Sequence, residues 1–379
     1  MNKRFENFNK QNRLSNFELL RIWAMLMIIG AHLACHGIQH CEDANVANII
    51  FYQGSLLNKI FTSALNVGGE VGVAIFFMLS GYFQAYNRKI RSLRKIILES
   101  IFYGWTNVIF FVILKLLGMH TLDFQSAFFY LVKLFFNPIS GGAWWFISSY
   151  ILLIILSPYI NKILLKLNDR GWMIFLIGVW LLWYSIGHVD RSSYYFIQRS
   201  ILFYSLGAYY RLKSKKGKIH NIFSLLFIIV VMWGIGAFFF YLISVYSGQE
   251  NIRMKVLSNF IDILKTSFIV PICAYLLFSI FAKWNLKTTR WINVCAQTTL
   301  GIYLIHDSVI FRNFIWYELI KVDTVLYKSV LFPIYAIVTI FGVFFICSII
   351  DLFRIKYIEP KMINFVDKLC MKYNKNLLI

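Results

Sequence analysis

The chain has 379 residues, of which 59% are hydrophobic and 18% are aromatic, while only 15% are charged. About a quarter of the residues in an ordinary soluble domain are charged, so this composition excludes one and indicates a membrane protein. The formal net charge of +21 is typical of basic loops that orient membrane helices, and we do not expect nucleic acid as a partner.

Ten apolar runs follow one another along the chain, each close to the 20 or so residues needed to cross a bilayer. In chain order the predicted spans are 18–38, 62–86, 96–118, 143–161, 171–188, 194–210, 220–246, 259–282, 291–311 and 329–353. The run 125–136 is too short to cross and is predicted to be interfacial or re-entrant. The fold class is therefore an all-α integral membrane bundle of about ten transmembrane helices.

The Lys and Arg residues give a check on this order, because they gather in cytoplasmic loops. With the N terminus inside, the inner segments hold 26 of them and the outer loops hold 8. Both termini are thus predicted to be cytoplasmic. The chain 1–379 is interpreted as a single membrane domain with a core of 15–353 and a basic cytoplasmic tail of 354–379.

Two polar side chains of the first span share one helix face, because Arg21 and His32 are eleven residues apart, about three turns. An arginine at the inner mouth can hold an anion, and a buried histidine can act as a base or nucleophile. The other interpretation is that the arginine snorkels to the lipid headgroups and the histidine bonds a neighbouring helix. In the ninth span, His306 is predicted to reach nearly the depth of His32, so that both can line one cavity.

The second span carries a carboxylate, Glu70, that needs a partner at its depth, and a membrane histidine is the partner that we expect. Gly68 and Gly72, one turn apart, favour close helix contact. On the inner side, Arg88, Arg91 and Arg94 recur every third residue and would form a phosphate-binding face suited to coenzyme A, or a topology anchor on anionic lipid.

The fourth span opens with two tryptophans at its outer end. Trp144 is predicted to belong to the interfacial aromatic belt, and Trp145 is the residue on which a sugar ring would stack. Nearby, one outer segment is rich in possible metal ligands, namely His36, His40, Cys41, Glu42 and Asp43. Their spacing matches no standard zinc pattern, so no metal is expected.

At these residues the sequence resembles acyltransferase family 3 of membrane acyltransferases. The resemblance covers about residues 15–350 and rests on the spacing of Arg21 and His32 and on a series of short motifs, FFMLSGY, the arginine-rich loop, WWF, FYSLGAYYR and YLIH. It implies O-acylation, usually O-acetylation, of surface carbohydrates such as capsule or exopolysaccharide, with acetyl-CoA as the donor on the inner side.

The resemblance also implies roles for individual residues. Arg21 and His32 match the family's essential pair, and the inner arginines match its proposed donor-binding loop. Catalytic candidates are therefore His32, Arg21, His306 and Glu70. The donor-binding candidates are Arg88, Arg91, Arg94 and Ser80, the last within FFMLSGY, and the substrate-binding candidate is Trp145.

The resulting expectation is a multi-pass O-acetyltransferase of a bacterial cell membrane. Its acceptor would be a surface polysaccharide or a lipid-linked oligosaccharide. The alternative is a transporter or flippase for lipid-linked sugar or acyl groups, but the inverted repeats common in such proteins are not evident. The residues leave open whether His32 forms an acyl-imidazole or acts as a general base.

Overall fold

The structure is a computed structural model that describes residues 14–40, 49–87, 93–118, 124–137, 139, 144–187, 193–213, 222–246, 252–321 and 326–376. Within these ranges the chain is helical and has no strand. The elements are α2 (Ser15–His32), η1 (Leu33–Ile38), α3 (Ile49–Gln53), α4 (Leu56–Gln84), α5 (Arg94–Leu116), α6 (Phe124–Phe136), α7 (Trp145–Leu164), α8 (Asp169–Gly187), α9 (Ser193–Lys213), α10 (Ile222–Tyr246), α11 (Ile252–Leu264), η2 (Lys265–Ile269), α12 (Val270–Lys283), α13 (Arg290–Gln297), α14 (Thr299–His306), α15 (Val309–Asn313), η3 (Phe314–Ile320), α17 (Phe332–Phe353), η4 (Arg354–Ile358) and α18 (Glu359–Asn376). The four elements marked η are π-helical.

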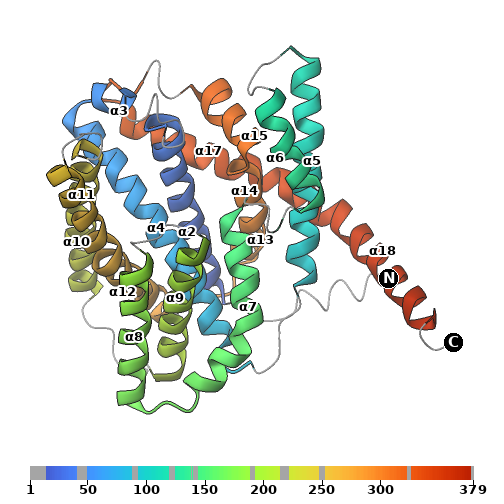
Figure 1. Cartoon of the computed structure of the whole chain (residues 1–379), viewed down its shortest axis with the longest axis horizontal. Coiled ribbons are helices and arrows are strands. Elements are labelled where there is room, and N and C mark those ends of the chain that lie inside the picture. The colour runs from blue at the N-terminus through green and yellow to red at the C-terminus, as the bar shows by residue number, and fades with distance from the viewer. Residues whose placement is uncertain are drawn as a thin grey trace.

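Helices α2 and α4 lie in the middle of the bundle, with α5 and α6 along one side and α10 and α11 along the other (Figure 1). Of the most apolar stretch of each span, 72% of Ser15–Ile38 and 61% of Leu56–Gln84 are buried, against 17% of Ile222–Val245. A helix that is apolar all round and little buried by protein is suited to face lipid, as α10 is. We refer below to the two ends of the bundle by the ends of the first span, as the Ser15 side and the Ile38 side.

The crossing of α2 and α4 depends on glycine. A Cβ added at Gly72 would lie 2.5 Å from the carbonyl oxygen of Ala24, and one added at Gly69 would lie 2.2 Å from Ala31 Cβ. The close contact predicted for the Gly68 and Gly72 pair is therefore confirmed at Gly72. A Cβ added at Gly68 would lie 3.0 Å from Trp233 of α10 and 3.7 Å from Met27 of α2. Close approach of the two helices places Gly69, Glu70 and Val73 of α4 around the same cavity as His32.

Over the described residues, seven helices are long and apolar enough to cross a membrane, and a bent pair would make eight. The bent pair, Arg290–His306 and Val309–Ile320, turns by 80°. The predicted spans 171–188 and 194–210 coincide with helices α8 and α9 but are not among these seven. The structure thus supports an all-helical membrane protein, while the count of ten and the position of the termini stay predictions.

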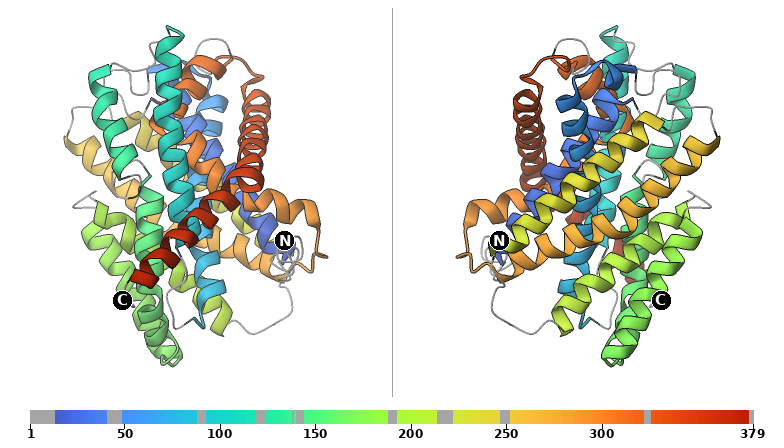
Figure 2. Two further views of the ribbon diagram at one scale, coloured as in Figure 1. Left: turned by 90° about the vertical axis from the view of Figure 1, so that its right-hand side faces the viewer. Right: turned by 90° about the vertical axis from the view of Figure 1, so that its left-hand side faces the viewer.

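The structure also describes the predicted interfacial run 125–136 and most of the predicted tail from residue 354. The run 125–136 forms α6, which has 13 residues and lies alongside α5 (Figures 1 and 2). Trp105 of α5 donates a hydrogen bond to the backbone carbonyl of Phe135 across this contact. The tail from 354 onward continues α17 through η4 into α18, whose ion pairs with α5 are described below.

Candidate functional site

Two histidines from distant parts of the chain meet inside the bundle. His32 is the last residue of α2, and His306 is the last residue of α14, just before the 80° bend. Their atoms His32 Nδ1 and His306 Nε2 are 2.9 Å apart, a hydrogen-bonding distance. The similar depth predicted for the two residues is confirmed, and the face shared by Arg21 and His32 is confirmed by the cavity that both line.

The hydrogen bonds of this pair determine which nitrogen of His32 can react. His306 Nδ1 lies 2.6 Å from the backbone carbonyl of Ile302, which can only accept, so Nδ1 carries the hydrogen. An uncharged His306 then accepts at Nε2, and His32 Nδ1 must donate to it. The lone pair of His32 therefore lies on Nε2, the nitrogen that can take a proton or attack a carbonyl carbon.

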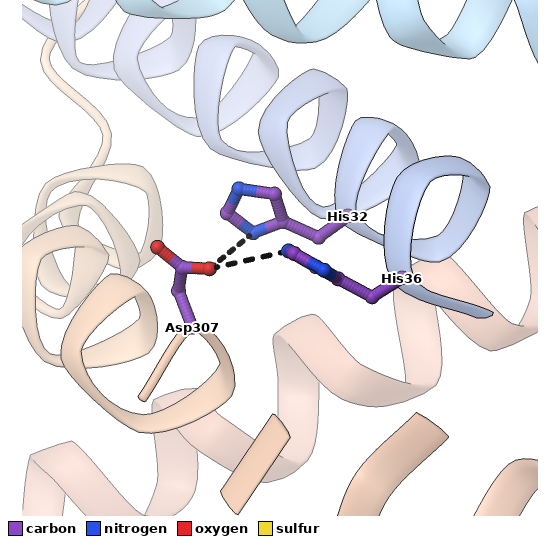
Figure 3. Close-up of side chains that lie close together, drawn as sticks. All are labelled: His32, His36 and Asp307. Carbon is purple, nitrogen blue, oxygen red and sulfur yellow. Dashed lines mark ion pairs between the residues drawn. The ribbon is translucent and has the colours of Figure 1, made fainter. Parts of the chain in front are cut away.

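Asp307, the residue next to His306, is the carboxylate that faces this pair. Its Oδ1 lies 3.6 Å from His32 Nδ1 and 3.6 Å from His36 Nε2, as Figure 3 shows. Arg312 Nη1 lies 3.8 Å from the same oxygen. Asp307 is 7% exposed, so its negative charge is shared among these groups instead of being solvated by water.

Sequence reasoning missed Asp307 and named Glu70 as the partner of a membrane histidine. The structure pairs Glu70 with Lys265 instead, as Glu70 Oε1 is 2.9 Å from Lys265 Nζ. Asp307 was recognisable as the acidic residue that follows YLIH in an apolar span. The missing information was the bend after His306, which turns the Asp307 side chain toward α2.

The same three side chains offer ligand atoms for a metal ion, because one atom each of His32, His36 and Asp307 lies within 4.8 Å of the others. Two features favour a hydrogen-bonded cluster over a metal centre. His32 Nδ1 is already bonded to His306, and Arg312 compensates the Asp307 carboxylate. A divalent cation would bring two positive charges to a carboxylate that already has an arginine.

A cavity of about 240 Å³ extends from His32 toward the Ser15 side of the bundle. Its wall includes Arg21, Ser80, Lys95 and Trp145. Ser80 Oγ donates to the Phe76 carbonyl at 3.1 Å and lies 3.4 Å from the hydroxyl of Tyr150, another lining residue. The cavity thus has cationic side chains at one end and an imidazole at the other.

The cationic residue of α5 in this wall is Lys95, not Arg94. Arg94 forms an exposed ion pair with Asp367 of α18, whereas Lys95 lines the cavity and lies 2.9 Å from Glu359. Arg88 and Arg91 lie outside the described residues. Lys95 was recognisable as the residue after Arg94 in the same basic segment, one position further round the helix.

A second cavity, of about 180 Å³, lies toward the Ile38 side. Glu70, Arg199, Asn66 and Cys35 are among its lining residues. The two cavities share four residues, namely Ile28, His32, Val73 and Trp145. His32 is therefore accessible from two cavities that extend toward opposite sides of the bundle.

The two tryptophans of α7 differ in their surroundings. Trp144 is fully buried in the core, so its assignment to an interfacial belt is wrong. The reason is that this end of α7 is covered by the segments packed around it in the principal core cluster. Trp145 lines both cavities together with His32, and its contact with a substrate stays a prediction.

Comparison with known proteins adds one finding. A family model described as an acyltransferase domain, that of acyltransferase family 3, matches residues 14–352. No curated protein and no solved structure matches the chain. The matched range contains the histidine pair, Asp307 and the lining residues of both cavities named above.

Proposed function

The chain belongs to acyltransferase family 3, and on this premise we propose that it transfers an acetyl group from acetyl-CoA to a hydroxyl of a surface polysaccharide. The enzyme is thus an integral membrane O-acetyltransferase of a bacterial cell membrane. Its acceptor is a capsule, exopolysaccharide or cell-wall polymer, or a lipid-linked oligosaccharide on its way to one.

The observation that carries this proposal is that His32 lines both cavities. A transferase must bring the carbonyl carbon of the donor and the hydroxyl of the acceptor to the same catalytic group. With one cavity extending to each side, a donor and an acceptor that never share a compartment can both reach His32. A flippase would instead need a single path for the whole molecule that it carries.

The donor is assigned to the Ser15-side cavity. The distribution of Lys and Arg in the sequence favours a cytoplasmic location for this side, and acyl-CoA is made in the cytoplasm. Arg21 and Lys95 line this cavity and are suited to the phosphates of coenzyme A, since charge-assisted bonds to phosphate are among the stronger hydrogen bonds. Ser80 and Tyr150 then flank the path of the acyl chain.

Two routes use His32 Nε2. In the first, its lone pair attacks the thioester carbonyl carbon and the thiolate of coenzyme A leaves. The acceptor hydroxyl then takes the acetyl group from the imidazole, and its proton passes to the freed Nε2 and from there to solvent. In the second, Nε2 removes the proton from the acceptor hydroxyl as this attacks the thioester, and the proton passes to the departing thiolate. In both routes His306 accepts the hydrogen bond from His32 Nδ1, and the Asp307 carboxylate, 3.6 Å from the same nitrogen, stabilises the positive charge that develops on the ring.

The proposal is tested by the acetyl content of the host's surface polysaccharide, measured by NMR. We compare wild type with His32→Ala at matched membrane expression, in a strain without a second acetyltransferase. Loss of the O-acetyl signals in the variant is expected. Equal acetylation in both strains would contradict the proposal and favour transport.

A further inference from the structure

A cluster of two buried cations, Lys265 and Arg199, and two partly buried carboxylates, Glu70 and Asp262, lies beside the Ile38-side cavity, and no step described above uses it. Lys265, which begins η2, is 2% exposed, and its Nζ is 2.9 Å from Glu70 Oε1 and 3.0 Å from Asp262 Oδ1. The ammonium also lies 4.4 Å from the ring centroid of Phe240, a residue that lines the cavity. Lys265 is therefore held by two carboxylates and an aromatic ring, and it fixes Glu70 in place.

The fourth member is Arg199 of α9, which lines the cavity together with Glu70. Arg199 is 7% exposed, and its Nη2 lies 3.3 Å from the backbone carbonyl of Glu70. The distance from Nη2 to Glu70 Oε2 is 3.9 Å, which is too long for a hydrogen bond. Within the described part of the chain, neither Glu70 Oε2 nor Arg199 Nε has a hydrogen-bond partner.

Such a gap between a guanidinium and a carboxylate suits a hydroxyl group. A hydroxyl donates one hydrogen bond and accepts others, so a single one can donate to Glu70 and accept from Arg199. Buried polar groups without partners carry a free-energy cost, which a bound hydroxyl would remove. Water can fill the same position until a ligand displaces it.

The charges of the cluster define the class of ligand. Two positive charges, on Lys265 and Arg199, balance two negative charges, on Glu70 and Asp262, and the only charged residues that line the cavity within the described ranges are Glu70 and Arg199. A carboxylate or phosphate on the ligand would therefore face Glu70 without an additional cation to compensate it. An uncharged molecule with several hydroxyls meets no such repulsion.

We propose that Glu70 and Arg199 bind the acceptor through one of its hydroxyls, and that the Ile38-side cavity selects an uncharged sugar over an anionic one. This inference rests on the proposed function, because the acceptor is assigned to this cavity from its contact with His32. One sugar hydroxyl bridges the two side chains, Trp145 lies against the ring, and a second hydroxyl is free to approach His32.

The test uses Cys35, which lines the same cavity, and needs no acetyl transfer. The purified full-length protein, without acyl-CoA, is alkylated by N-ethylmaleimide, and modification of Cys35 is followed by peptide mass spectrometry. The probes are the methyl glycosides of glucose, galactose and N-acetylglucosamine, and those of glucuronic and galacturonic acid. We expect at least one neutral glycoside to slow alkylation, at a concentration about tenfold lower than the uronides require.

Variants then assign the effect to the two residues. Arg199→Met and Glu70→Gln should raise the concentration of sugar that protects Cys35 by about tenfold. Arg211→Met is the matched control on the same helix, since Arg211 is exposed and contacts Tyr82. It should leave protection unchanged. Arg199→Lys, which keeps the charge and loses the planar donor set, replaces Arg199→Met if the latter does not fold.

Three results would overturn the inference: no glycoside protects Cys35, uronides protect as well as neutral sugars, or folded Arg199→Met is protected like wild type. The outcome is separable from the test of the proposed function. Arg199-dependent protection together with unchanged acetylation in His32→Ala would retain the sugar site and reject the transferase. Loss of acetylation in His32→Ala without any protection would reject the sugar site alone.

Discussion

The hydrogen bond between His32 and His306 predicts the effect of removing its acceptor. In His306→Ala the Nδ1–H of His32 loses its partner at 2.9 Å, and the Asp307 carboxylate is 3.6 Å away, too far for a hydrogen bond. A buried donor left without a partner costs about 1–3 kcal/mol. The tautomer and ring orientation in which His32 reacts should become less stable by this amount. Turnover is then expected to drop about 5- to 150-fold, since about 1.4 kcal/mol is a factor of ten.

The matched variant is His306→Gln, because the side-chain amide of glutamine extends about as far as histidine Nε2 and its oxygen can accept the same hydrogen bond. We expect this variant to lose much less activity than His306→Ala. The assay is acetyl transfer by purified protein in nanodiscs, with the melting temperature of each variant measured to ensure that only folded protein is compared. Full activity in folded His306→Ala, or equal losses in the two variants, would refute the role assigned to His306.

Three further predictions concern donor binding by Lys95, the glycine contact between α2 and α4, and whether activity requires a metal ion. Lys95→Ala should raise KM for acetyl-CoA several-fold at low salt and less at high salt, whereas Arg94→Ala should not, because Arg94 pairs with Asp367 away from the cavity. The measurement is steady-state kinetics at two ionic strengths, and a larger increase of KM in Arg94→Ala than in Lys95→Ala would contradict this assignment. Gly72→Val should lower the melting temperature, since an added Cβ already meets a carbonyl at 2.5 Å, while Gly178→Ala, with no atom within 4 Å, should not. Treatment with a chelator should leave acetyl transfer unchanged, and activity lost on chelation and restored by Zn²⁺ would make the two histidines and the aspartate of Figure 3 a metal site.

The similar depth of His32 and His306 was predictable because it depends only on the rise per residue of an α-helix. The rise of about 1.5 Å per residue is the same in every α-helix, so two residues equally far from the inner ends of parallel spans lie at similar depth. Apolar runs likewise predicted the positions of the helices, including α8 and α9. The motif spacing identified the family, which the match to residues 14–352 confirms.

What sequence could not predict depends on breaks in that regularity and on which helices are neighbours. The π-helical turn of η1 follows His32 directly and changes the direction of His36, and the bend after His306 does the same for Asp307. Neither alters the hydropathy of its run. The pairing of Glu70 with Lys265 requires α4 to lie beside η2, and the order of spans around a bundle is not encoded in their apolarity.

The two cavities meet at His32, and Ile28, Val73 and Trp145 are the other residues common to both. A membrane that stores energy as an ion gradient tolerates no open channel through its enzymes. Under the proposed function, the apolar side chains of Ile28, Val73 and Trp145 lie where the cavities meet, and only a two-carbon unit would cross there, by bond exchange, while ions and the nucleotide stay on their own sides. For such an enzyme, substitution of Trp145 by a small residue is as much a test of ion leakage as of catalysis.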